Sequence, residues 1–154
     1  MGCDIHGYWE VKDHTGNWMA FENINEIRNY MWFGIIAGVR GGPDIGTANR
    51  GIPPDPSGAY QDMLDDCGDD LHSHTWLTPK EVAEACQELN NRMIEAYNDP
   101  HPEPYEDVPG LDTTLRRILP HSLADWPWFG NLKDLMMPGA ELNESLRLVV
   151  CFDS

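Results

Sequence analysis

Apolar and polar residues alternate along residues 1–12, which is the pattern of a half-buried β-strand. One face is mainly apolar and consists of Cys3, Ile5, Trp9 and Val11. The other face is polar and consists of Asp4, His6, Tyr8 and Glu10. Turn-forming residues follow at 13–17, and residues 18–21 can return as an antiparallel partner, which predicts a hairpin. Residues 144–153 also alternate and predict another strand at the opposite end of the sequence.

Several segments between these strands predict helices. Residues 27–40 are apolar nearly all round and are followed by Gly-Gly-Pro, which indicates a buried helix. A short helix is expected at 59–65. The sequence Thr-Pro-Lys-Glu at 78–81 is a capping box, and apolar residues then recur at helical spacing as far as Tyr97, which predicts the main amphipathic helix. Shorter helices are predicted at 111–119 and from 132, after an acidic, proline-rich connection at 98–110.

These elements predict a single α+β domain that spans residues 1–154. The simplest arrangement is a small antiparallel sheet that includes the N- and C-terminal strands, paired with each other, with helices covering one face. This pairing would bring Asp153 or Arg147 near the polar face of the first strand. Residues 41–58 contain five glycines and four prolines, and a loop longer than about 12–15 residues is unusual in a compact domain. This segment is therefore either a ligand cover that carries Arg50 or a surface loop.

The formal net charge of −16, from 26 acidic and 10 basic residues, narrows the range of partners. Its long-range field repels DNA, RNA and anionic membranes, so we expect no polymeric nucleic acid and no membrane as partner. A small anionic molecule is compatible with this charge, because a metal ion or arginines can reverse the field inside a pocket. The sequence shows no signal peptide and no apolar run near the roughly 18 residues of a membrane helix, and its four widely spaced cysteines suit reduced thiols. These features favour a cytoplasmic location.

Two fragments have the spacing of metal ligands. Asp4 and His6 are two residues apart, and so are His72 and His74, which follow Asp70. In extended backbone, residues two apart point to the same side, so each fragment can offer two ligands to one ion. Imidazole together with carboxylate favours a divalent transition metal such as Zn, Mn or Fe over Ca or Mg. The alternatives are a hydrogen-bonded pair on a strand for the first fragment and a polar approach to a helix for the second.

A bound metal would favour hydrolysis, because the ion lowers the pKa of a bound water and stabilises developing negative charge. Glu10 or Asp70 would then be the general base. Without a metal, the same histidines can hydrogen-bond a phosphate or the edge of a base. The remaining candidate ligand-binding residues are three arginines for phosphate charge and two aromatic residues for stacking: Arg28, Arg40, Arg50, Tyr30 and Trp76.

Segments across the whole chain carry a resemblance to a known family. They are Met-Gly-Cys-Asp-Ile-His at 1–6 with the strand that follows, Arg28-Asn29-Tyr30 with Phe33 and Val39-Arg40, the segment 50–53, His-Ser-His-Thr-Trp-Leu at 72–77, and Phe152-Asp153. With these motifs the chain resembles a poorly characterised family of small proteins encoded mainly by bacteriophages and prophages. The resemblance implies a single domain that acts in the cytoplasm of the host cell. Small acidic phage proteins often act against host defence, which by analogy suggests a nucleotide-type ligand such as a cyclic nucleotide.

The sequence leaves three hypotheses. The first is a metal-dependent hydrolase, a phosphodiesterase of a small nucleotide-like molecule with a counter-defence role, in which Asp4, His6, His72 and His74 are the ligands. The second is a non-catalytic binding protein that sequesters a nucleotide signal. The third is an acidic protein-interaction module in which the histidines serve only structure.

Overall fold

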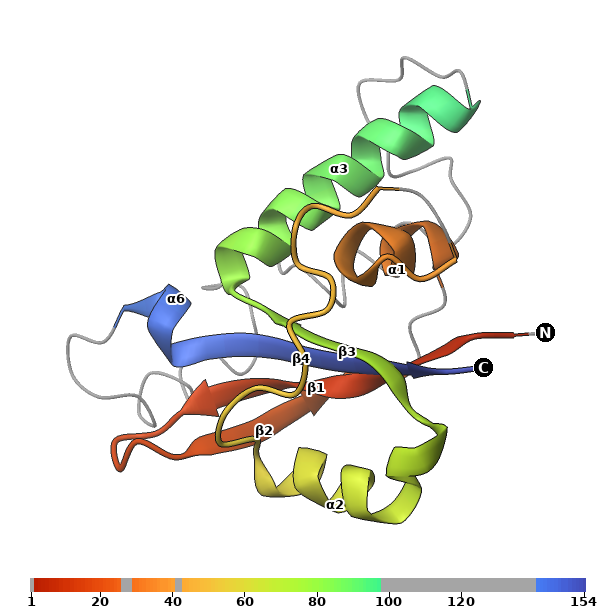
Figure 1. The fold of residues 1–154 in the computed structure, drawn as a ribbon. Helices are drawn as coiled ribbons and strands as arrows, with labels where there is room; N and C mark the ends of the chain where they lie inside the picture. Colours follow the sequence, from red (N-terminus) through yellow and green to blue (C-terminus); the bar gives the residue numbers. More distant parts are fainter. Residues whose placement is uncertain (1, 26–28, 41–42, 98–140) are drawn as a thin grey trace.

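The first and last strands of the chain are neighbours at the centre of one antiparallel sheet (Figure 1). The computed structural model describes residues 2–25, 29–40, 43–97 and 141–154. In this part the strands are β1 (Asp4–Lys12), β2 (Trp18–Asn23), β3 (His72–Leu77) and β4 (Leu146–Asp153), and their order in the sheet is β2-β1-β4-β3. The predicted α+β class, with both terminal strands in one antiparallel sheet, is confirmed.

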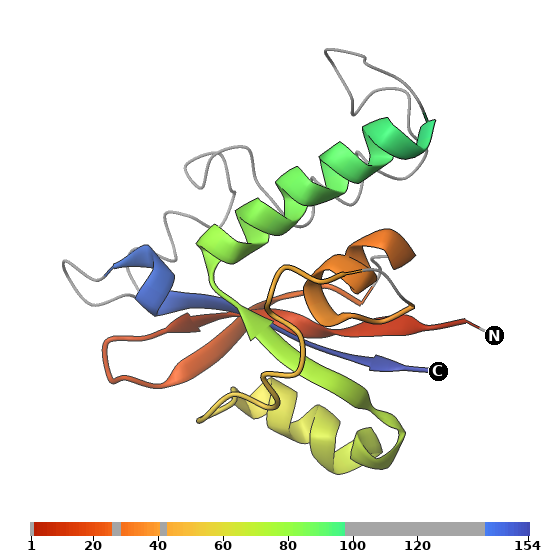
Figure 2. The same cartoon turned by 45° about the horizontal axis from the view of Figure 1, so that its top comes forward.

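Helices cover both faces of this sheet. The helical elements are α1 (Tyr30–Ala37), α2 (Gly58–Cys67), η1 (Gly68–Asp70), α3 (Pro79–Tyr97) and α6 (Leu142–Ser145). Helices α1 and α3 lie on one face and α2 lies on the other (Figures 1 and 2). The prediction of helices on one face was therefore incomplete. The reason lies in β4, whose central position leaves both its faces buried, so that Val149 and Cys151 pack with Tyr60 of α2.

The predicted alternation of β1 matches its two environments. Ile5 and Trp9 belong to the core under α1 and α3, whereas Tyr8 packs against the cluster around Tyr60 on the α2 face. Tyr8 is paired with Val149 of β4. The polar row of β1 therefore faces α2.

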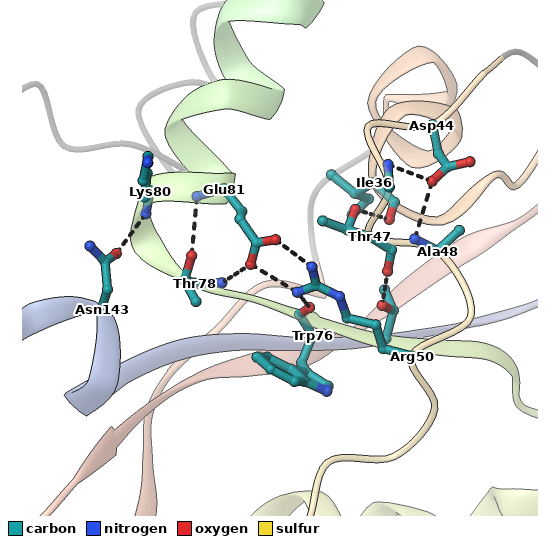
Figure 3. Close-up of polar contacts among 12 residues, drawn as sticks. Ile36, Asp44, Thr47, Ala48, Arg50, Trp76, Thr78, Lys80, Glu81 and Asn143 are labelled. Carbon is teal, nitrogen blue, oxygen red and sulfur yellow. Dashed lines mark hydrogen bonds and ion pairs between the residues drawn. The ribbon is translucent and has the colours of Figure 1, made fainter.

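Local signals set the ends of two helices. Asn29 accepts a hydrogen bond from the backbone N–H of Trp32, and Gly38, in the left-handed conformation with φ 69°, ends α1. The helix is thus shorter than the predicted 27–40. The capping box of α3 forms as predicted, with reciprocal bonds between Thr78 and Glu81 of 3.0 and 3.3 Å (Figure 3). The predicted elements at 98–110, at 111–119 and from 132 lie outside the described residues.

The long loop runs along the outer edge of β3 (Figure 3). Gly51 N–H donates to the carbonyl of His74 at 2.9 Å, and the Thr75 hydroxyl donates to the carbonyl of Thr47. The Thr47 hydroxyl donates in turn to the carbonyl of Ile36 at 2.6 Å. These bonds join the loop to both β3 and α1, and the first of them satisfies the backbone carbonyl of His74 on the edge strand.

Candidate functional site

A carboxylate orients a histidine where β4 ends. The Nε2 atom of His6 lies 3.0 Å from Oδ2 of Asp153. The strand register produces this contact, because Asp4 is opposite Asp153 and His6 is opposite Cys151. Oδ1 of Asp153 accepts a second bond, of 3.2 Å, from the backbone N–H of Asp4. Since the side chains of His6 and Asp153 are 27% and 41% exposed, solvent can reach the pair.

The charge state of Asp153 defines the tautomer of His6. The hydrogen bond from His6 is the main influence that lowers the pKa of Asp153, and the backbone N–H of Asp4 and the charge of His72 act in the same direction. An ionised carboxylate can only accept hydrogen bonds, so Nε2 of His6 carries the proton. The lone pair of the neutral ring is then on Nδ1, and this atom can take up a proton from a reactant or a water.

A cation and an aromatic ring lie next to Cys3, the residue directly before β1. The backbone N–H of Cys3 donates to the Tyr30 hydroxyl at 3.5 Å, and the Arg40 guanidinium lies over the Tyr30 ring at 5.0 Å. Burial raises the pKa of the Cys3 thiol, Arg40 lowers it, and the charge of Asp153 raises it further. These influences place Arg40 and Asp153 in the same neighbourhood of Cys3. Among the predicted site residues, Asp4, His6, Tyr30 and Arg40 therefore gather at this end of the sheet.

The two histidines of β3 take different partners. His72 is opposite Phe152 in the register, and the centroids of the two rings are 6.4 Å apart. Nδ1 of His74 instead lies 2.9 Å from the Tyr60 hydroxyl of α2. The register of β3 shifts between His72 and Thr75, and Ser73 has a positive φ of 55°. This bulge interrupts the period of two that would place both imidazoles on one side.

Two potential metal-ligand atoms lie together in the pair of His6 and Asp153. Within the described ranges, no group of three or more His, Cys, Asp or Glu side chains is arranged to hold an ion. His6 and Asp153 offer two ligand atoms, with Asp4 opposite the carboxylate on the neighbouring strand. His72 lies near enough for its charge to act on Asp153. Nε2 of His72 is buried and has no hydrogen-bond partner among the described residues.

The other predicted site residues lie elsewhere. Glu10 is fully buried and pairs with Arg147 at 2.6 Å, toward the other end of β1. Arg50 forms a two-pronged ion pair with Glu81 and donates to the carbonyl of Trp76 at 3.0 Å (Figure 3). Asp70 belongs to η1, beside a cavity of about 190 Å³ that is lined by residues 64–70. Arg28 lies outside the described residues.

Sequence reasoning missed two features that shape these sites. Tyr60 binds His74 from α2, and no sequence pattern linked the two segments. Trp18 lies under the guanidinium of Arg147, with 3.9 Å between Cζ and the ring centroid. In the sequence, only the predicted hairpin indicated where that indole would lie, and in the structure Trp18 is paired with Lys12.

Comparisons of the chain with protein-family models, with curated proteins and with solved structures find no match. None of the helices in the described part of the chain has the length and apolar character needed to cross a bilayer. Because the comparisons find no relative, the chemistry of the site must be inferred from its own residues.

Proposed function

We propose that the protein is a hydrolase of a small, nucleotide-like phosphodiester and that His6 moves the proton in the reaction. The observation that carries this proposal is the pair of His6 and Asp153, 3.0 Å apart and accessible to solvent. A carboxylate that fixes the tautomer of an imidazole makes its second nitrogen an effective base near neutral pH. Arg40, whose charge acts on Cys3 as that of Asp153 does, would supply a positive charge for a phosphate in a chain of net charge −16.

The same two side chains support a metal-dependent form of this proposal. Two ligands of a tetrahedral zinc ion are about 3.3 Å apart when each bond is about 2.0–2.1 Å. Nε2 of His6 and Oδ2 of Asp153 are 3.0 Å apart, so a small shift would admit Zn, Mn or Fe between them. Asp4, opposite Asp153, would complete a set of three ligands. A divalent ion would also offset the repulsion between these two carboxylates.

The two forms differ in the role of His6. In the metal-free form, Nδ1 of His6 accepts the proton of the water as its oxygen bonds to phosphorus, and returns that proton to the leaving alcohol oxygen as its P–O bond breaks, while Arg40 binds the phosphate. In the metal-dependent form, His6 would hold the ion, which would lower the pKa of a bound water, so activity would depend on added metal. His72 and His74 were predicted as ligands, and in this form they remain proposals for completing the coordination.

Hydrolysis can be tested with a panel of cyclic and linear dinucleotides and a chromogenic phosphodiester. Each substrate is incubated with the protein in EDTA and, separately, with Zn, Mn or Fe. His6→Gln and Asp153→Asn should each reduce the rate by about 100-fold or more, because general acid–base groups contribute about 10²–10⁴-fold. His14→Gln, in the exposed turn of the hairpin, is the matched control and should leave the rate unchanged.

Each outcome has a definite meaning for the proposal. Absence of product with every substrate and metal would refute hydrolysis, and so would full activity in His6→Gln. Recovery of intact ligand after heating a stable complex would instead identify a binding protein that sequesters a nucleotide signal. The exposed Tyr30 ring, 44% exposed beside Arg40, is the feature that favours this second function. Either function would suit the counter-defence role that the family resemblance suggests.

A further inference from the structure

A cavity of about 320 Å³ lies at the start of β4, whereas Asp153 is the last residue of that strand. The residues that line it include Trp18, Trp76, Arg147, Asp55 and Glu144. These residues come from β2, β3, β4, the long loop and α6, which the sheet brings together. The cavity shares none of its lining residues with the pair of His6 and Asp153.

Both indoles already contact guanidinium groups. Cζ of Arg147 lies 3.9 Å from the centroid of the Trp18 ring, and Cζ of Arg50 lies 4.9 Å from that of Trp76. The face of an indole carries negative electrostatic potential and attracts a guanidinium or alkylammonium ion. The two tryptophans that line the cavity therefore already stabilise cations within this protein.

The positive charge of Arg147 is neutralised inside the fold. Its Nε donates to the fully buried Glu10 at 2.6 Å. Its Nη1 and Nη2 donate to the backbone carbonyls of Pro54 and Asp55 at 3.2 and 2.9 Å. Because Glu10 cancels this charge, Arg147 adds little attraction for an anion in the cavity.

The carboxylates of Asp55 and Glu144 give the cavity its remaining formal charge. Both residues are exposed to solvent, and the charge of Asp55 also acts on Arg147. A cationic ligand with N–H donors would form charge-assisted hydrogen bonds with them, whereas a phosphate would be repelled. The net charge of −16 adds a long-range attraction for cations.

We propose that this cavity binds a guanidinium or alkylammonium group, which stacks on an indole and donates hydrogen bonds to Asp55 and Glu144. The group belongs either to a free small amine or to an arginine or lysine side chain of a partner protein. This binding is independent of the proposed hydrolysis, since it uses a separate site and the opposite ligand charge.

The test is a titration of the full chain with N-acetylarginine amide, followed by calorimetry and tryptophan fluorescence. The uncharged N-acetylnorleucine amide is the control ligand. The double variant Asp55→Asn, Glu144→Gln should weaken arginine amide binding at least tenfold, because it removes both charges while keeping the shape of the two side chains. Asparagine tolerates the left-handed backbone of residue 55, where φ is 53°, so this variant should fold. Asp66→Asn with Asp69→Asn removes the same charge at exposed positions of α2 and η1 and should bind as the original chain does.

Short peptides separate the two sources of the cation. An arginine-containing peptide that binds at least tenfold more tightly than arginine amide indicates a partner protein, and equal affinities indicate a free amine. Three results would overturn the proposal: no saturable binding of arginine amide, equal weakening in the two double variants, or tighter binding of an uncharged nucleoside than of arginine amide. Circular dichroism of each variant excludes loss of fold as the cause.

Discussion

Glu10 and Arg147 lie 137 positions apart in the sequence and form an ion pair whose carboxylate is fully buried. The second oxygen of Glu10 accepts a bond from the backbone N–H of Ser57 at 2.9 Å, directly before α2. One side chain thus joins β1, β4 and the start of α2. Glu10 was predicted as a general base, and the structure shows it engaged at both oxygens in holding the fold.

Removing the charge of Glu10 should destabilise the protein strongly. Glu10→Gln leaves the guanidinium of Arg147 buried without a counter-charge, and breaking a buried pair in this way costs about 3–5 kcal/mol. Urea denaturation measures this loss. The control Glu88→Gln breaks the i,i+4 pair with Arg92 on α3 and should cost about 0.5 kcal/mol or less. Similar losses in the two variants would contradict a special role for the buried pair.

Gly7 allows β1 to approach β4 closely. A Cβ atom at this position would overlap the carbonyl oxygen of Val149 and lie 3.0 Å from Cα of Val150. Gly7→Ala must push apart the two central strands and should cost roughly 3 kcal/mol, at the upper end of typical overpacking. Gly58→Ala is the control, because its added methyl group meets no atom within 4 Å, and it should change the free energy of unfolding by less than about 1 kcal/mol. Thermal unfolding of the two variants gives the comparison.

His74 should make the fold sensitive to mild acid. Burial lowers its pKa, and the charge of His72 lowers it further. The unfolded histidine, with a pKa near about 6.5, therefore binds a proton before the folded one does, and the free energy of unfolding falls as the pH drops below that value. His74→Asn should flatten this decline between about pH 7 and pH 5. His14→Asn, at an exposed position, should retain the slope of the original chain, and equal slopes in all three proteins would exclude His74 as the cause.

The paired hydrogen bonds from the Arg50 guanidinium to Glu81 hold the long loop against β3. The two Nη atoms of Arg50 bind the two oxygens of Glu81, and the side chains are 27% and 21% exposed. Lysine keeps the charge but cannot make the paired bonds, so Arg50→Lys should cost about 1 kcal/mol. Hydrogen exchange of the Gly51 amide, which donates to His74, should become faster in this variant. Unchanged exchange would show that the loop does not depend on the paired bonds.

The features predicted correctly all had a strong local signal. The alternation around Ile5 and Trp9 identified the buried face of β1, and the capping box at Thr78 and Glu81 fixed the start of α3. Pairing the two terminal strands also predicted that Asp153 or Arg147 would lie near the polar row, and both do, where they bind His6 and Glu10.

The remaining features depend on contacts that are distant in the sequence. Residues 72–77 lack alternation, and they form a strand because β4 and the long loop provide hydrogen-bond partners on either side. The bulge at Ser73 arises within that pairing, and it separates the partners of His72 from those of His74. The predicted alternation of the last strand was wrong, because β4 is buried on both faces. Its apolar run at 148–152, a pattern typical of such a strand, was the only signal for the helix on the second face.

The central position of β4 has a consequence for synthesis on the ribosome. β4 is translated after β1, β2 and β3, yet it lies between β1 and β3 and supplies hydrogen bonds to both. Until it emerges, the nascent chain holds a hairpin with an unpaired inner edge and apolar residues such as Ile5 and Trp9 without their cover. The sheet therefore completes only after residues 146–153 have emerged, and chains that stop before residue 146 should be captured by chaperones or degraded.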